Sequence, residues 1–110
     1  MIHEYSGADT SSPLDKDACN PQASVTNATN AVTSGNITTV SAKELLFGWG
    51  NPDNGTLSAG TNFTLRQVSA SGGVTEDRIV TSTGTYAATE TDNTNGDDTY
   101  MMIATFKVAN

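Results

Sequence analysis

The stretch from Glu90 to Asp98 holds the side chains best suited to chemistry in this 110-residue sequence. Four carboxylates and two Asn amides fall within nine residues, and oxygen atoms of this kind are the ligands that Ca²⁺ prefers. The spacing differs from that of an EF-hand, because the Glu required at the twelfth position is missing. One interpretation is a weak calcium site with Asp92, Asp97 and Asp98 as ligands, joined by Asp53 if both acidic loops share one end of the fold. The other is a solvated hairpin tip.

Trp49 is the candidate residue for contact with an organic ligand. It stands between Gly48 and Gly50 beside a cluster of turn-forming residues, and large aromatic side chains near the edges of a fold often mark interaction surfaces. Aromatic faces also stack on apolar ligand surfaces, so a glycan is one candidate ligand. The three Tyr residues lie in apolar-patterned strands, and we expect them in the core: Tyr5, Tyr86 and Tyr100.

The residues needed for catalysis are not grouped together. Glu76 and Asp77 are neighbours within a predicted strand and must point to opposite faces, so they cannot act on one substrate as acid and base. We expect one of them to be solvated or to pair with Arg66, Arg78 or a Tyr hydroxyl. His3 has no second His, activated Ser or Cys, or Gly-rich phosphate loop to work with. The sequence therefore predicts that the protein is not an enzyme and has no cofactor other than Ca²⁺.

The single Cys19 cannot close a disulfide within the chain, and we expect it to be a loop residue or to form a disulfide between chains. Thr, Ser, Asn and Gly make up 48 of the 110 residues (18 + 10 + 10 + 10), a composition common on secreted bacterial surfaces. Residues 1–20 contain four carboxylates and no apolar stretch, so we expect any export signal to lie upstream. The predicted location is secreted or at the cell surface.

Charge and length exclude several classes of partner. The chain has twelve acidic and five basic residues and a formal charge of −7, which leaves no basic surface for nucleic acid or anionic lipid. No stretch approaches the roughly 20 apolar residues of a membrane helix. The length allows a single domain, residues 1–110.

Short polar and β-preferring runs alternate with turn residues along the whole sequence, which is typical of an antiparallel β-sandwich. A polar loop is expected over about residues 6–22. The longest predicted strand, Thr99 to Val108, carries apolar residues on both sides, and the apolar run Glu44 to Trp49 is predicted to be a central strand. The remaining predicted strands are Ile2–Tyr5, Ala23–Thr26, Ile37–Ser41, Thr61–Val68, Val74–Ser82 and Thr85–Thr89.

Several short stretches, in this order, carry a resemblance to a known kind of module: Glu4-Tyr5-Ser6-Gly7 with Pro13-Leu14-Asp15, Glu44-Leu45-Leu46-Phe47-Gly48, Gly60 to Arg66, Glu76 to Val80, Gly84-Thr85-Tyr86 and Ala104 to Lys107. The chain resembles the C-terminal half of a module of large secreted or surface bacterial proteins, often beside adhesin-like and carbohydrate-active regions. The resemblance implies a jelly-roll or concanavalin-like β-sandwich and brings no catalytic motif with it.

The half-length resemblance leads to a prediction about assembly. Backbone groups that would pair with missing strands need other partners, and an unpaired strand edge is a template for another chain. We therefore expect a homo-oligomer, a dimer or larger, in which a second chain completes the sandwich through exposed strand edges. The predicted function is a non-catalytic extracellular structural or assembly module, with a carbohydrate- or calcium-binding module as the alternative.

Overall fold

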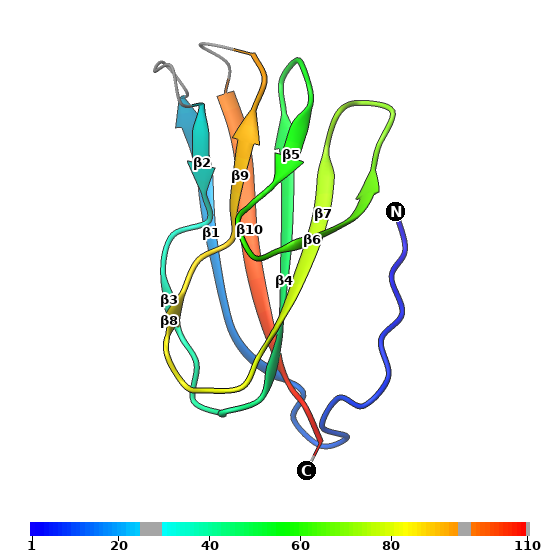
Figure 1. Ribbon diagram of the computed structural model, residues 1–110, viewed down its shortest axis with the longest axis vertical. Coiled ribbons are helices and arrows are strands. Elements are labelled where there is room, and N and C mark those ends of the chain that lie inside the picture. Colours follow the sequence, from blue (N-terminus) through cyan, green and yellow to red (C-terminus); the bar gives the residue numbers. More distant parts are fainter. Residues whose placement is uncertain (25–29, 95–97, 110) are drawn as a thin grey trace.

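The computed structural model describes the backbone of residues 1–24, 30–94 and 98–109, and the side chains of all of these except residues 20–24. Every regular element in these ranges is a β-strand, and all of the strand pairs are antiparallel. The predicted all-β antiparallel sandwich is therefore confirmed (Figure 1). The described residues include no helix with the length and apolar character needed to cross a membrane.

One layer is a five-stranded sheet, called the large sheet below. Its strand order is β1-β10-β4-β7-β6. The strands are β1 (Leu14–Ser24), β10 (Asp98–Lys107), β4 (Glu44–Pro52), β7 (Val74–Val80) and β6 (Thr64–Val68). The run Glu44 to Trp49 thus forms a central strand, as predicted from its compact apolar residues and its strand length.

The second layer consists of two small sheets that cover one face of the large sheet. Strands β2 (Ala31–Thr33), β9 (Thr89–Asp92) and β5 (Leu57–Ala59) form one of them, in the order β2-β9-β5. Strands β3 (Ile37–Thr38) and β8 (Thr85–Tyr86) form the other. We call the covered face of the large sheet its inner face and the opposite one its outer face.

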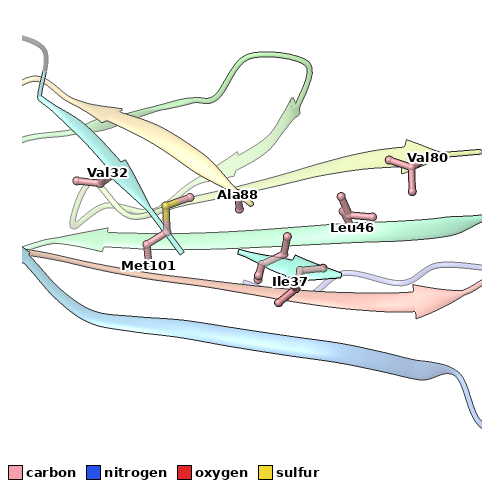
Figure 2. Close-up of a cluster of buried hydrophobic side chains, with 7 residues drawn as sticks. Val32, Ile37, Leu46, Val80, Ala88 and Met101 are labelled. Atoms are coloured by element: carbon pink, nitrogen blue, oxygen red, sulfur yellow. The ribbon is translucent and has the colours of Figure 1, made fainter. Parts of the chain in front are cut away.

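The hydrophobic core lies between the two layers and draws residues from both (Figure 2). From the large sheet, Leu46, Met101 and Ile103 are almost completely buried, because alternate residues of a strand point to the same face. The full cluster is Val32, Ile37, Leu46, Val80, Ala88, Met101 and Ile103. Half-buried side chains that pack against this cluster are Ala18, Phe63 and Tyr86.

Strand β1 differs from the sequence-based prediction of a polar loop over about residues 6–22. From Leu14 onward the chain pairs with β10, Leu14 lying opposite Phe106. An edge strand needs a neighbour on one side only and can keep most of its side chains in water, so its residues carry no apolar alternation. Cys19 lies on this strand, exposed, and not in a loop.

Two other predicted strands also differ from the structure. Residues 2–5 are not hydrogen-bonded into a sheet. Side-chain contacts hold them on the fold instead, such as the hydrogen bond from the Tyr5 hydroxyl to Asp77. The predicted strand from Thr61 begins only at Thr64, and Leu65 is exposed although its alternation with polar residues predicted burial. Strand β6 is the other edge of the large sheet and has no layer opposite it, so alternation there does not indicate a buried face.

Candidate functional site

The outer face of the large sheet is the candidate functional site, because apolar side chains lie there without a second sheet over them. The first eight residues, called the N-terminal segment, cross this face and reach the end of β10, where Ala8 bridges to Val108 (Figure 1). Three surface hollows lie along the segment, and both Tyr5 and Phe106 line every one of them. The largest of these three has a volume of about 310 Å³ and is lined by Met1, His3, Tyr5, Phe47 and Phe106.

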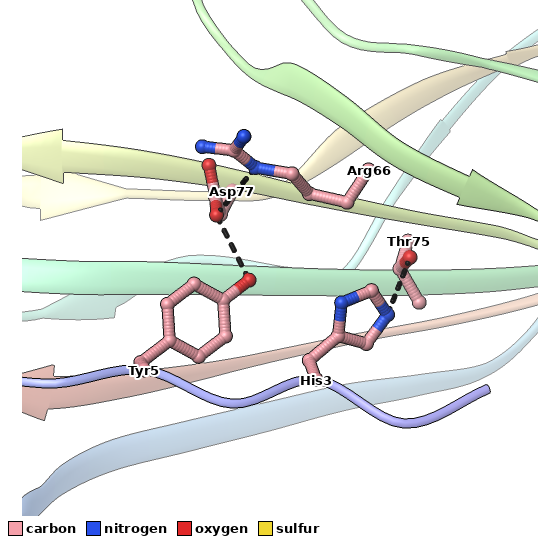
Figure 3. Close-up of polar contacts among 5 residues, drawn as sticks. All are labelled: His3, Tyr5, Arg66, Thr75 and Asp77. Atoms are coloured by element: carbon pink, nitrogen blue, oxygen red, sulfur yellow. Dashed lines mark hydrogen bonds and ion pairs between the residues drawn. The ribbon is translucent and has the colours of Figure 1, made fainter.

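A polar network holds the N-terminal segment on the outer face (Figure 3). The Tyr5 hydroxyl donates a hydrogen bond to Asp77 Oδ2 at 2.8 Å, and Arg66 Nε donates to the same oxygen at 2.7 Å. Two residues earlier, His3 Nε2 lies 3.0 Å from Thr75 Oγ1. The network therefore links the segment to two strands of the large sheet, β6 and β7.

Aromatic contacts support the same placement. The His3 ring lies 5.3 Å from the Phe47 ring, centroid to centroid, and the Tyr5 ring meets Phe47 edge-on at 6.2 Å. Edge-to-face geometry at this distance is favourable for aromatic rings. Phe47 on β4 thus forms the floor on which the two side chains of the segment rest.

The chemistry of this network is that of a clamp. Burial, together with the hydrogen bond to Asp77, raises the pKa of Tyr5 to about 12, so its hydroxyl stays protonated at neutral pH and acts as a donor. The Asp77 oxygen is shared by a hydroxyl and a guanidinium, which satisfies it. Asp77 is thus the acid that faces Arg66 and a Tyr hydroxyl, as the sequence predicted for one of the adjacent pair, and its neighbour Glu76 points to the inner face.

Trp49 lies on the outer face of β4, opposite Met102 on one side and Thr75 on the other. It is half-buried, and the strand continues beyond it to Pro52. Trp49 therefore belongs to the same surface as Phe47 rather than to a separate turn. Tyr100 shares this face and is exposed, and Tyr5 is also exposed, so the expectation that both lie in the core is wrong; Tyr86 does pack against it.

The predicted calcium ligands lie at one end of the sandwich. Asp92 is buried, and its two oxygens accept hydrogen bonds from Thr99 Oγ1 at 2.7 Å and from the Thr94 backbone N–H at 2.9 Å. The Asp53 N–H donates to the Asp98 carbonyl at 2.9 Å, so the two acidic loops do meet. Asp97 lies outside the described residues. Within the described ranges, no three acidic, His or Cys side chains are grouped closely enough to hold a metal ion.

A pair of glutamates lies between the layers, and the sequence did not predict it. Glu76 on β7 and Glu90 on β9 are almost completely buried, and they lie against Gly48 and Gly50 of β4. A Cβ atom at Gly50 would overlap Glu90 Oε2, and one at Gly48 would come within 2.9 Å of Glu76 Cγ. The two glycines, spaced by two and therefore on one face of a strand, make room for the two carboxyl groups. That spacing was the available sequence signal.

These two carboxyl groups are poorly satisfied. Glu76 Oε2 accepts a hydrogen bond from the Gly60 N–H at 2.7 Å, whereas Glu76 Oε1 and both oxygens of Glu90 have no hydrogen-bond partner among the described residues. Burial raises the pKa of Glu76 to about 7. Burial, with a contribution from the nearby Glu76 carboxylate, raises the pKa of Glu90 to about 8. A buried carboxyl group without partners favours its protonated form.

Glu44, at the other end of β4, is a third buried acid. Its Oε1 accepts a hydrogen bond from the Ser41 N–H at 3.0 Å, and burial raises its pKa despite that bond. With Asp92, four carboxyl groups are therefore buried on the inner side of the sandwich, and none of the four forms an ion pair with a described residue.

Comparisons of the chain with protein-family models, with curated proteins and with solved structures find no match.

Proposed function

We propose that this chain is a non-catalytic assembly module of a secreted or surface-exposed bacterial protein, and that it works by associating with a second copy of itself. The observation that carries the proposal is that β4 and β10, the central strands of the large sheet, have apolar residues on both faces. Leu46 and Met101 point inward, and Phe47, Trp49 and Met102 point outward.

Strands with two apolar faces are typical of sheets that are covered on both sides. On the inner face the small sheets provide that cover. On the outer face the described cover is the N-terminal segment, which leaves Met102 and Tyr100 exposed. A further layer supplied by another molecule would complete the burial.

The polar groups on the outer face support a structural role. Tyr5, Arg66 and Asp77 are engaged with one another, and His3 contacts Thr75. The contact between His3 and Thr75 does place an imidazole beside a hydroxyl, which is the arrangement that covalent catalysis uses. Thr75 is almost completely buried, however, so its hydroxyl is not open to attack on a substrate.

Calcium binding by the two acidic loops at one end of the sandwich is a second candidate function, and the contact between Asp53 and Asp98 favours it. This backbone contact places the loop that follows β4 beside the start of β10, and the carboxylate oxygens of two such loops are the ligand type that Ca²⁺ prefers. Among the described residues the acidic side chains are not grouped closely enough to hold the ion, so the proposal requires them to move together when Ca²⁺ binds.

Light scattering of the purified chain at micromolar concentration, with and without millimolar Ca²⁺, tests both candidates. The assembly proposal expects twice the mass of 11.4 kDa or a larger closed multiple. A monomer across the concentration range would refute it. If the chain has a calcium site, Ca²⁺ should change its mass or its thermal stability, and Asp98→Asn should abolish that change. An identical response to Mg²⁺ and to salt alone would rule out a specific site.

A further inference from the structure

We propose that Glu76 and Glu90 form a pH-sensitive latch between the two layers of the sandwich. While both carboxyl groups carry protons, the latch holds the three-stranded small sheet (β2-β9-β5) on the large sheet, and ionisation of the two groups releases it. The inference goes beyond the proposed assembly and does not depend on it. The position of the two groups, the lack of a compensating charge among the described residues and the attachment of the small sheet all support it.

The two carboxyl groups come from opposite layers and lie over the same strand. Glu76 belongs to β7 of the large sheet, and Glu90 belongs to β9 of the three-stranded small sheet. Both side chains have 1% of their surface exposed or less. The Glu76 side chain lies against Gly48 and the Glu90 carboxyl group against Gly50, and these two glycines follow one another on the inner face of β4. A change of charge in this pair therefore acts across the contact between the layers.

No positive charge is paired with the two groups among the described residues. Arg78 follows Glu76 by two residues on β7 and so points to the same face, but its guanidinium lies over the Tyr86 ring, 5.6 Å from the centroid, and forms no ion pair with Glu76. Two further acids are buried on the inner side, Glu44 at the far end of β4 and Asp92, whose two oxygens accept hydrogen bonds. The strand positions directly beside the pair carry residues that do not titrate: Val32, Gly48, Gly50, Ala59, Leu65 and Met101.

These surroundings favour the protonated form of both groups. Glu76 Oε2 accepts a hydrogen bond from the Gly60 N–H at 2.7 Å, whereas the other oxygen of Glu76 and both oxygens of Glu90 have no hydrogen-bond partner among the described residues. A carboxylate charge that is buried without partners is strongly destabilised. In agreement with this geometry, burial raises the pKa of Glu76 to about 7 and that of Glu90 to about 8, so both charges appear on passing from neutral to mildly alkaline pH.

The three-stranded small sheet is the part of the fold best able to move. Its strands have three, four and three residues, and within the described ranges they pair with one another and not with a strand of the large sheet. The Gly60 N–H, directly after β5, donates to Glu76, so the latch itself supplies a bond between the layers, and the Leu57 N–H reaches the Gly72 carbonyl at 3.3 Å. Strands β4 and β10, with nine and ten residues, pair along their length. Short elements with few bonds open at a lower free energy than a long central ladder.

Release follows from the way in which Glu90 is seated. Its Oε2 occupies the position that a Cβ atom at Gly50 would overlap, so the carboxyl group lies directly on the backbone of β4. Water can surround the ionised group only after β9 has moved away from β4. In the open state both groups regain an ordinary pKa, so the closed state holds more protons than the open one, and a rising pH favours opening. The large sheet keeps its own pairing of β4 with β10 in that state.

Hydrogen exchange of the full chain, measured at pH 6 and pH 9 in low urea and corrected for the intrinsic effect of pH, tests the latch. Each pH unit between the open and closed pKa changes the opening equilibrium about tenfold. From pH 6 this interval covers about one unit for Glu76 and about two for Glu90, which together allow about 1000-fold. Water entry and relaxation reduce this limit, and we expect the amides of β2, β5 and β9 to exchange about 30-fold faster at pH 9 than at pH 6. At pH 9 they should also exchange faster than the amides of β4 and β10, with little dependence on urea.

Glu90→Gln keeps the size of the side chain and removes its charge, so the acceleration should fall to about threefold. Glu4→Gln, the same change at an exposed position, is the matched control and should keep the full acceleration. A common exchange rate and urea dependence in both layers at pH 9, or an acceleration that Glu90→Gln leaves intact, would overturn the latch. The comparison between the layers of the wild-type chain decides the question even if Glu90→Gln does not fold. A chain that is monomeric at all concentrations but opens in this way would refute the assembly proposal and leave the latch standing.

Discussion

Raising the pH from 5 to 8 should destabilise this protein, because Glu76 and Glu90 are buried together between the layers. Both groups have a pKa near 4.5 when unfolded, and in the folded chain these values rise to about 7 and about 8. The folded state therefore holds protons that the unfolded state has lost. Their contribution to stability is fully present below pH 4.5 and disappears as the pH rises through about 7 and then about 8.

The size of the effect follows from the same values. Each group contributes a slope of about 1.4 kcal/mol per pH unit over the interval between its unfolded and folded pKa. From pH 5 to 8 the interval covers about two units for Glu76 and three for Glu90, which gives an upper limit of about 7 kcal/mol. Relaxation of the fold and water entry reduce this penalty, and half of the upper limit is about 3.5 kcal/mol. That is a large share of a typical stability of 5–15 kcal/mol.

Urea unfolding at pH 5, 6, 7 and 8, followed by the fluorescence of the single Trp49, measures this loss directly. Glu90→Gln should lower the slope of stability against pH by at least half, because it removes the group with the higher pKa. Glu4→Gln is the matched control at an exposed position and should leave the slope unchanged. Asp9 does not interfere, because hydrogen bonds from Ser12 and Ser11 lower its pKa to about 2, below this window.

The reasoning would be refuted by a free energy of unfolding that stays constant or rises between pH 5 and 8 at a constant urea m-value. A wild-type slope retained in full by Glu90→Gln would show that other groups cause it, with Glu44 as the next candidate, since burial raises its pKa too.

Three further predictions concern packing. Gly50→Ala should destabilise the fold by about 2 kcal/mol, because the new methyl group overlaps the Glu90 carboxylate. Glu90→Ala in the same chain should recover part of this loss. Strictly additive effects of the two substitutions in a double-mutant cycle would contradict the contact between Gly50 and Glu90. Leu46→Ala should cost about 3 kcal/mol in urea unfolding, since Leu46 is completely buried, and a cost below 1 kcal/mol would exclude it from the core. Tyr5→Phe removes one donor to Asp77 and should cost about 1 kcal/mol and speed proteolysis within residues 1–8; unchanged cleavage would argue against the clamp.

The sequence predicts best where burial is decided locally. After Glu44, the run at residues 45–49 has no polar side chain that could face water, so its place in the middle of a sheet follows from composition. Strand β10 shows the limit of such patterns. Its two sides are both apolar, and alternation alone does not reveal that Met101 and Ile103 are inward while Tyr100 and Met102 face out. The position of the second layer decides this, and that layer comes from distant parts of the chain.

The buried acids and strand β1 were missed for related reasons. Glu76 and Glu90 fit into the core because Gly48 and Gly50, on a different strand, leave room for them, and that pairing depends on the register of β4. Strand β1 has a polar sequence that reads as a loop, and only the presence of β10 beside it makes it a strand. In both cases the deciding neighbour is far away in the sequence.

The contact between the N-terminal segment and the end of β10 governs the order in which the molecule can form. Asp9 donates its N–H to the Lys107 carbonyl, and Ala109 donates to the Gly7 carbonyl, so these bonds join residues from opposite ends of the described chain. Closing such long loops is entropically costly until β10 has paired with β4. During synthesis, the apolar outer surface of β4 therefore stays uncovered until residues 98–109 have left the ribosome. The N-terminal segment, which precedes every strand along the described chain, therefore completes these contacts only after the last strand is in place.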